Sequence, residues 1–587
     1  MAGSPNARGR FPGATALGYP PSQMRTATAR PLPLAPPTKR AVWASAITTL
    51  FVALVAATPR SPFHSVLPRG LEPGGPFRLV SDMVGLDRLG QTGLFLVGIL
   101  ATTAAALAFL LVLRETWHNR LTLRHVLVMA VAFHIVVLML PLLFSRDAYS
   151  YAYIGKIVTS YGGNPWVDTP RDYNLNSLFK LTCPGWRSTP SVYGPLFTWV
   201  SVLLTGTLKS IPSLITGFQL VAMIASLGTT WLVARTVQRA MPERTVFAAA
   251  IVGLNPIVVF HVVGGGHNDM LVALFVAASG ASLFSGRKLA AAVALGLAVS
   301  VKATAAIPLL LLLVVVAAAA PSRRRLREVA VHAGAAGLVW LVLAFPFLQT
   351  TNPLLGLFDV ADNSSWMAPG QLVVQVFDGV GGFLGGDGGA DAGSVLARLL
   401  VFGASATGIV FIAREIWRRP EARTPRALAA AWAWGMLVLI LPSPVLFTWY
   451  LVWILPLAWA LPRVPRRALV ALSVFFFVTQ VVTESSRLPD ALETISLPFG
   501  HPVAIAVLFW VARDLIRRLR SGTLLHVETD RPELGDRFER SPEPRLREIA
   551  AMDAEADTAR PDRSGAGARP RTALERVASV GTTRRSM

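Results

Sequence analysis

The sequence predicts an all-α polytopic membrane protein, and three observations support this fold class. Of the 587 residues, 53% are hydrophobic and only 15% are charged, which is too apolar for an ordinary soluble domain. Apolar runs long enough to cross a bilayer recur along the chain. Arginines gather in the short segments between these runs, where they orient the spans and meet anionic lipid. The net charge of +22 is therefore explained by membrane topology, and nucleic-acid binding is excluded.

The two ends of the chain differ in composition from its middle. Residues 1–40 are basic and rich in proline, and we expect a disordered cytoplasmic tail without a cleavable signal peptide. Residues 516–587 carry mixed charge and are expected to form a second disordered cytoplasmic tail. Residues 41–515 should form one transmembrane domain of about 13–14 helices. The single cysteine, Cys183, excludes an internal disulfide.

The first three spans set the direction of the chain. They are expected near residues 41–58, 93–113 and 125–144, with a basic segment after the second. Because the basic segments should face the cytoplasm, the chain leaves the third span on the outer side. The pair Arg146 and Asp147 is therefore expected outside.

Three later segments depart from simple crossings. If residues 192–208 crossed fully, the next basic loop would lie outside, so we expect this segment to be re-entrant or interfacial. Residues 289–320 lie between two basic loops and should form a hairpin with Lys302 at its turn. The first arm would be about 20 Å long, short of a hydrocarbon core of about 30 Å, which places Lys302 in a protein-lined cavity. The glycine-rich stretch 351–394 is expected to be an external loop and a candidate lid.

Asp147 is the first candidate catalytic residue. Ser145 can cap a helix that begins here, and both the helix dipole and Arg146 favour the charged carboxylate. An anionic aspartate at the membrane edge can take a proton from an acceptor hydroxyl. The alternative is a simple N-terminal helix charge paired with Arg146, and the spacing alone does not separate the two interpretations.

Aromatic residues accompany this aspartate and recur near the end of the domain. Tyr149 and Tyr151 follow it directly, Tyr193 lies further on, and Trp449 and Tyr450 follow a proline-broken segment. Such residues either anchor the protein at the membrane interface or line a cavity that binds sugar.

Two polar features complete the candidate site. The run G-G-G-H-N-D at 264–269 permits a tight turn, and its His267, Asn268 and Asp269 offer hydrogen-bond donors and acceptors. The alternative is a plain turn with Asn268 as a helix cap, and one histidine with one aspartate is too few ligands to predict a metal. Lys302 at membrane depth is a functional hypothesis, since a compact ammonium suits a phosphate. The alternative for Lys302 is snorkelling to the surface.

Together these motifs resemble a known family. The order is F-S-R-D-A-Y-S-Y at 144–151, Y-G-P-L at 193–196, G-G-G-H-N-D at 264–269, V-K-A at 301–303, and P-S-P at 442–444 before W-Y. It resembles the polyprenol-phosphomannose-dependent α-1,6-mannosyltransferases of actinobacteria, which are GT-C glycosyltransferases, over roughly residues 40–515. The resemblance implies an inverting transfer of mannose from polyprenyl monophosphate mannose to the mannan of lipomannan or lipoarabinomannan. It also implies a plasma-membrane enzyme with cytoplasmic termini, an active site on the outer face, and neither a cofactor nor a nucleic-acid partner.

The resemblance further implies roles for individual residues. Asp147 would be the catalytic base. The sequence offers no convincing set of metal ligands, so no metal-binding residues are predicted and metal dependence stays open. The donor-binding residues would be Arg146, Lys302, His267, Asn268 and Asp269, and the acceptor or cavity residues would be Tyr149, Tyr151, Tyr193, Trp449 and Tyr450. Two alternatives remain: a transferase for another polyprenyl-phosphate sugar such as arabinofuranose, and a transporter of lipid-linked sugars. A transporter would suit the broken hairpin, but the sequence shows no inverted repeat and gathers its polar residues on one side.

Overall fold

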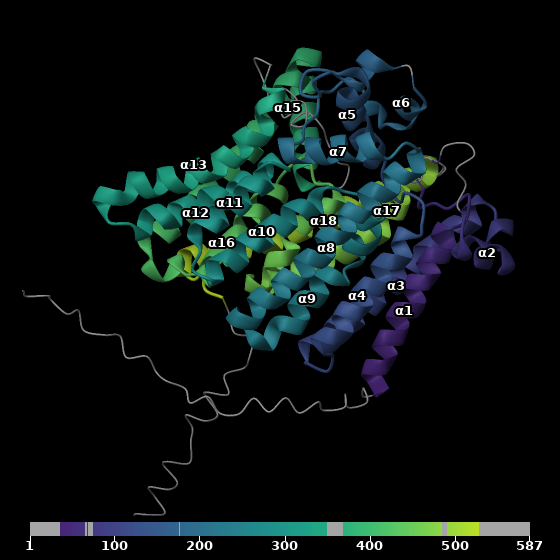
Figure 1. The fold of residues 1–587 in the computed structure, drawn as a ribbon, viewed down its shortest axis with the longest axis horizontal. Coiled ribbons are helices and arrows are strands. Elements are labelled where there is room, and N and C mark those ends of the chain that lie inside the picture. The colour runs from purple at the N-terminus through teal and green to yellow at the C-terminus, as the bar shows by residue number, and fades with distance from the viewer. Residues whose placement is uncertain are drawn as a thin grey trace, which may run out of the picture. The chain divides into compact units, whose positions relative to one another are not determined.

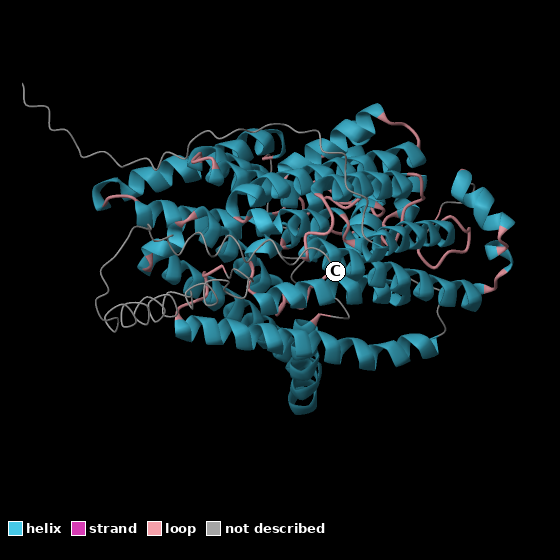
Figure 2. Ribbon diagram, turned by 90° about the horizontal axis from the view of Figure 1, so that it is seen from below, coloured by secondary structure: helices cyan, strands magenta, loops and turns pink. Residues whose placement is uncertain are grey.

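Helices form the architecture of this protein. The computed structural model describes residues 36–64, 67, 74–174, 176–348, 368–483 and 490–527, and these residues contain helices and loops without a strand (Figure 2). Most of the two expected tails, residues 1–35 and 528–587, lie outside the described residues. Helix extends a few residues into each expected tail: the first helix begins at Pro36, and the last helix ends at Ser521.

The helices follow one another along the chain (Figure 1). They are α1 (Pro36–Ala56), α2 (Pro76–Met83), α3 (Gln91–Trp117), α4 (Leu123–Leu138), α5 (Asp147–Tyr161), α6 (Ser177–Leu181), α7 (Pro195–Thr207), α8 (Ile211–Ala240), α9 (Thr245–Gly253), α10 (Asp269–Phe284), α11 (Lys288–Val299), α12 (Ala306–Ala319), α13 (Arg325–Ala344), α15 (Pro369–Arg418), α16 (Pro425–Ile440), α17 (Arg463–Thr483) and α18 (Asp490–Ser521). Two shorter helices contribute to the site, η5 (Ile257–Val263) and η10 (Thr448–Trp453).

Seven helical segments in the described residues are long and apolar enough to cross a membrane. They belong to α1, α3, α8, α9 with η5, α13, α15 and α17, and six shorter apolar helices accompany them. The predicted all-α polytopic membrane fold is thereby confirmed. The 13–14 crossings expected from the sequence require the shorter helices to cross as well. With 13 and 12 residues, α7 and α11 are only about 18–20 Å long, too short to cross alone.

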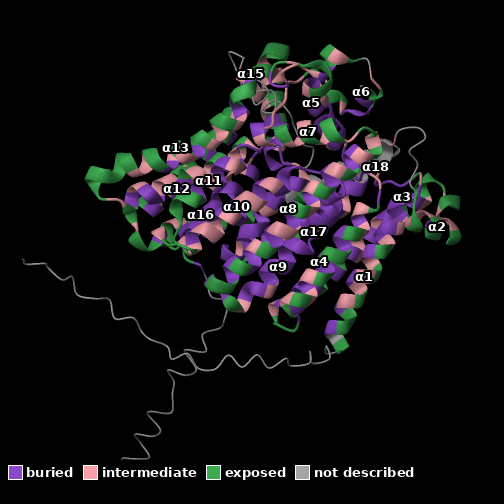
Figure 3. Cartoon of the chain, viewed as in Figure 1, coloured by how far each residue is buried: buried purple, intermediate pink, exposed green. Residues whose placement is uncertain are grey.

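Burial separates an inner layer of helices from an outer one (Figure 3). The segment Pro242–Val263 is the innermost, with 94% of its most apolar window buried, whereas only 17% of the corresponding window in Ser322–Phe347 is buried. The second segment contains α13, which packs against α11 and otherwise presents apolar side chains outward. A surface of this kind suits contact with lipid. The inner layer, which also includes α10 and α16, holds the candidate site.

The hairpin around Lys302 has the form expected from the sequence. Its first arm, α11, ends at Val299, and its second arm, α12, begins at Ala306. Lys302 lies between them in extended backbone, with φ −151° and ψ 131°. The chain therefore reverses at Lys302 and turns its side chain into the protein.

The expectation of a loop over residues 351–394 is wrong over the described part, 368–393. Here α15 begins as a helical hairpin that reverses at Gly385 and Gly386, where the backbone leaves helical geometry. Glycine is unfavourable in helices, but here it permits close contact between the two arms. A Cβ on Gly381 would lie 2.0 Å from the carbonyl oxygen of Gly389, so the glycines encode backbone packing.

Candidate active site

Asp147 opens helix α5, as predicted. Its backbone N–H donates a hydrogen bond to Oγ of Ser145 at 3.1 Å, while the residue at the cap position, Arg146, makes no capping hydrogen bond with its side chain. The Asp147 side chain is 14% exposed. Its Oδ2 accepts a hydrogen bond of 3.3 Å from the hydroxyl of Tyr151, one helical turn further on. The carboxylate is therefore accessible and also held in place.

The G-G-G-H-N-D turn between η5 and α10 brings three polar side chains into the protein interior. His267, Asn268 and Asp269 are 0%, 2% and 0% exposed. Gly265 leaves room for the histidine, because a Cβ there would lie 2.8 Å from Cδ2 of His267. Nδ1 of His267 lies 3.5 Å from Oδ2 of Asp147. Asn268 stands at the cap position of α10 without a side-chain capping bond, so a plain capping role does not explain it.

Lys302 is paired with Asp269 at the start of α10. Its Nζ donates to Oδ1 of Asp269 at 2.9 Å, and Nε1 of Trp453 donates to the same oxygen at 2.8 Å. The ammonium lies 4.5 Å from the ring centroid of Tyr450, 5.1 Å from that of Trp453 and 5.8 Å from that of Tyr193. These distances are in the range of cation–π contacts. The side chain of Lys302 therefore ends in an aromatic cage and does not snorkel to the surface.

Four of the five aromatic residues predicted for the cavity belong to one cluster around Lys302 and His267. These are Tyr151, Tyr193, Trp449 and Tyr450, and the ring centroids of Tyr151 and Tyr193 are 5.2 Å apart. Burial raises the pKa of Tyr193, and the charge of Asp147 raises it further. Burial also raises the pKa of Tyr450, with the charge of Asp269 adding to the effect. Both phenols therefore stay neutral at neutral pH and can donate hydrogen bonds.

The fifth aromatic residue, Tyr149, lies at the start of α5 close to Arg146. Tyr149 is buried, which raises its pKa to about 12, and the positive charge of Arg146 opposes this rise. Neither residue takes part in the Lys302–Asp269 ion pair.

The buried turn has polar atoms left over. Both ring nitrogens of His267, both amide atoms of Asn268 and Oδ2 of Asp269 are buried without a hydrogen-bond partner among the described residues. Native proteins rarely leave buried polar atoms unpaired, so five in one turn call for an explanation, and a polar ligand that contacts this turn would supply one. No group of three or more His, Cys, Asp or Glu side chains in the described part of the chain could hold a metal ion.

Sequence reasoning missed Trp453, His261 and Thr448. Trp453 bonds Asp269, and its ring stacks on that of Tyr450 at 4.2 Å. Tyr450 and Trp453 both lie in η10, a 3₁₀ helix, in which residues three apart share a face. The three-residue spacing in W-Y-L-V-W could therefore have identified Trp453 as a neighbour of Tyr450. Nε2 of His261 lies 3.1 Å from the Thr448 hydroxyl, a pairing across 187 residues that no local pattern reveals.

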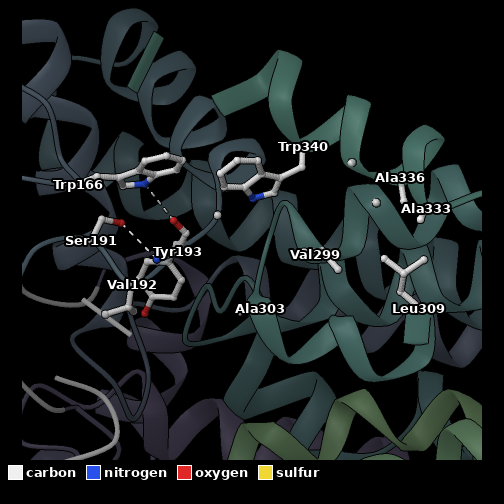
Figure 4. A pocket seen from close by; sticks show the side chains of 13 residues that line it. Trp166, Ser191, Val192, Tyr193, Val299, Ala303, Leu309, Ala333, Ala336 and Trp340 are labelled. Atoms are coloured by element: carbon white, nitrogen blue, oxygen red, sulfur yellow. Dashed lines mark hydrogen bonds between the residues drawn. The ribbon is translucent and has the colours of Figure 1, made fainter. Parts of the chain in front are cut away.

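An apolar pocket of about 360 Å³ lies beside this cluster, between α11, α13 and the loop before α7 (Figure 4). Trp166 and Trp340 stack near one end with ring centroids 5.9 Å apart, and Trp166 donates to the carbonyl oxygen of Tyr193. Small and aliphatic residues line the remainder, namely Val192, Gly194, Gly296, Val299, Ala303, Leu309, Ala333, Ala336 and Gly337. Tyr193 also contacts Lys302, and Ala303 follows Lys302 in the chain, so the pocket and the polar cluster share a wall.

Comparison with known proteins gives a consistent set of relatives. Residues 75–320 match the family described as alpha-(1->6)-mannopyranosyltransferase, N-terminal domain. Alpha-(1->6)-mannopyranosyltransferase A of Mycobacterium tuberculosis is 30% identical over 343 residues, which is 56% of this chain and 64% of that protein. The protein of the same name in Corynebacterium glutamicum is 29% identical over 178 residues, 29% of this chain and 36% of that protein. Alpha-(1->6)-mannopyranosyltransferase B of C. glutamicum is 26% identical over 408 residues, 64% of this chain and 65% of that protein.

These matches cover less than two thirds of the length of each of these relatives. No solved structure matches this chain significantly. The family match includes Asp147, the turn at 264–269 and Lys302, whereas Trp449, Tyr450 and Trp453 lie beyond it. Over the matched region, this chain is therefore similar to the α-(1→6)-mannopyranosyltransferases of mycobacteria and corynebacteria.

Proposed function

We propose that this protein transfers mannose from polyprenyl monophosphate mannose to an α-1,6-mannan acceptor of the lipomannan or lipoarabinomannan type. One observation carries the proposal. A carboxylate, Asp147, and a caged ammonium, Lys302, belong to one buried cluster that also holds the unpartnered polar atoms of the 264–269 turn. The relatives' names, which state mannose transfer and an α-1,6 linkage, support the choice of sugar and bond.

The chemistry of this step needs a base and a stabilised leaving group. Asp147 would take the proton from the acceptor hydroxyl as its oxygen attacks the anomeric carbon of mannose. The bond from that carbon to the phosphate oxygen would break, and the polyprenyl phosphate would leave with the electron pair. Attack opposite a β-linked phosphate gives an α-mannoside, so the reaction inverts the configuration.

Lys302 would stabilise the charge that develops on the departing phosphate oxygen. Asp269 and Trp453 hold this lysine in position, with Asp269 accepting hydrogen bonds from both. Asn268 and Nε2 of His267 would bind sugar or phosphate oxygens of the donor, with Arg146 near the entrance. Tyr149, Tyr151, Tyr193, Trp449 and Tyr450 would form the wall against which the acceptor binds.

The apolar pocket supports a donor carried on a lipid. Its lining is mostly apolar, and it lies between the cluster and α13, whose surface is largely exposed. An isoprenoid chain in this pocket would leave its phosphate beside the wall formed by Tyr193 and Ala303, close to Lys302.

The same reaction suggests a membrane arrangement. We propose that residues 41–515 form the catalytic domain in the plasma membrane, with residues 1–40 and 516–587 as cytoplasmic tails and the active site on the outer face. The basic segments between the apolar runs support this orientation.

A transfer assay in membranes that lack the host enzyme tests the proposed function. Membranes containing the wild-type protein are given polyprenyl-phosphate mannose and a short α-1,6-mannoside. We expect a product extended by one α-linked mannose, identified by mass spectrometry and α-mannosidase digestion. Transfer from polyprenyl-phosphate arabinose but not mannose would identify a different sugar. Movement of lipid-linked sugar across vesicles without transfer would contradict the enzyme hypothesis.

Filling the pocket should weaken binding of long-chain donors. A Cβ at Gly337 would enter open space and Gly337 lines the pocket, so Gly337→Leu should place its side chain where the isoprenoid chain lies. We expect the donor KM to rise about tenfold for a long-chain donor, as expected for losing burial of one to two methylene-sized groups at roughly 0.8 kcal/mol each. A donor with a two-isoprene chain should be much less affected.

Gly334→Leu provides the matched control. Gly334 lies one turn earlier on α13, is also exposed with open space at its Cβ, and does not line the pocket. Its kinetics should stay within twofold of wild type for both donors. Equal effects of the two substitutions would show that the lipid chain binds elsewhere.

A further inference from the structure

His267 lies buried among aromatic rings. Its ring is 0% exposed and stacks on Trp449 with centroids 4.2 Å apart and on His261 with centroids 5.4 Å apart. His261 and Trp449 also contact each other, with centroids 5.3 Å apart, and Phe144 and Phe447 stack on them in turn, so the five rings form one compact cluster. Burial in this cluster restricts the orientation of the imidazole.

This buried ring brings one nitrogen close to the carboxylate of Asp147. Nδ1 of His267 lies 3.5 Å from Oδ2 of Asp147, and the hydroxyl of Tyr151 donates to the same oxygen at 3.3 Å. The other carboxylate oxygen, Oδ1, takes part in neither contact. Hydrogen bonds of a catalytic site are often long before substrate binds and shorten in the reacting complex.

We propose that His267 is a positioning residue for Asp147 in the transfer reaction, which rests on the proposed function. Its Nδ1–H holds Oδ2, together with Tyr151, and so presents Oδ1 to the acceptor hydroxyl. An N–H donor held at one carboxylate oxygen leaves the other oxygen free to accept the proton of the acceptor hydroxyl. Arranging the base before the substrate arrives removes the cost of ordering it during the reaction.

The position of His267 is costly for stability, which supports a functional role. Nε2 is buried without a hydrogen-bond partner among the described residues, and Nδ1 has only the 3.5 Å contact with Asp147, which is too loose to count as a hydrogen bond before substrate binds. Buried polar atoms without partners destabilise the folded state. A phenylalanine would pack in the same aromatic cluster without this cost, so packing alone does not explain a histidine here.

Two substitutions separate the ring from its nitrogen. His267→Phe keeps a stacking ring and removes Nδ1, whereas His267→Asn removes the ring and keeps an amide nitrogen one bond from Cγ, where Nδ1 lies. We expect His267→Phe to lower kcat about 10- to 100-fold, the range for partners that orient a functional side chain. Both variants lose Nε2, so the donor KM should rise to a similar extent in each. His267→Asn should retain a larger share of kcat, and His267→Phe should raise the midpoint of thermal unfolding.

Transfer is measured at saturating donor and acceptor, at equal protein level, with wild type in the same preparation. Wild-type kcat in His267→Phe would overturn the inference, as would an equal loss of kcat in both variants. An increase in donor KM with unchanged kcat would show that His267 binds the donor without positioning Asp147, and would also overturn the inference. If wild type itself transfers no mannose, the proposed function fails and this role fails with it. If wild type transfers mannose and His267→Phe does so equally well, only the role of His267 fails.

Discussion

Replacement of Asp147 by asparagine should reduce mannose transfer about 10²- to 10⁴-fold, the usual contribution of a general base. Asparagine matches aspartate in shape, so the contacts with Tyr151 and His267 can be kept while the proton acceptor is lost. The reduction should appear in kcat, because the acceptor still binds but its hydroxyl is no longer deprotonated in the transition state. Initial rates at saturating donor, at equal protein level in membranes, measure the effect.

Asp82→Asn is a suitable control for this substitution. Asp82 lies on α2, is 38% exposed and pairs with Arg78, and it has no contact with the aromatic cluster among the described interactions. Transfer should be unchanged in this variant. If Asp147→Asn also transferred at the wild-type rate, Asp147 would be a structural helix charge, and Asp269 would become the next candidate base.

The sequence carries enough information to locate the two ends of the proposed site. Asp147 follows a serine at the point where an apolar run ends, and local capping chemistry predicts a helix start there. Lys302 interrupts an apolar run between two basic segments, and the short arm before it predicts a buried turn. Both predictions depend on neighbours within one or two turns, which is the range over which sequence patterns act.

The partners of these residues depend on the tertiary fold and could not be predicted in this way. Lys302 meets Asp269 across 33 residues, and Asp269 meets Trp453 across 184. The glycines at 379–393 led to the wrong prediction of a loop. Glycine is common in flexible loops, but it also allows two helical arms to pack closely, as it does here. In each case the deciding contact comes from a distant segment of the chain.

Removal of the Lys302 ammonium should have the second large effect, on both stability and transfer. Lys302→Met leaves the buried carboxylate of Asp269, which is 0% exposed, without its cation. Breaking a buried ion pair from one side costs about 3–5 kcal/mol of unfolding free energy. Loss of one group that stabilises developing charge lowers kcat roughly 10²- to 10³-fold. Thermal unfolding in detergent and transfer rates in membranes measure the two effects separately.

A double variant separates the structural part of this effect from the catalytic part. Lys302→Met with Asp269→Asn removes both charges, and Trp453 can still donate to the asparagine oxygen. Stability should therefore recover most of its loss, because no unpaired charge remains buried. Transfer should not recover, because the departing phosphate still lacks a cation.

The ion pair of Arg78 and Asp82, whose side chains are 23% and 38% exposed, provides the matched control. Arg78→Met with Asp82→Asn should change the free energy of unfolding by no more than about 1 kcal/mol and leave transfer intact. If the Lys302–Asp269 double variant regained wild-type transfer, the pair would serve the fold alone, and the leaving phosphate would need another partner, with Arg146 the nearest candidate in the sequence to Asp147.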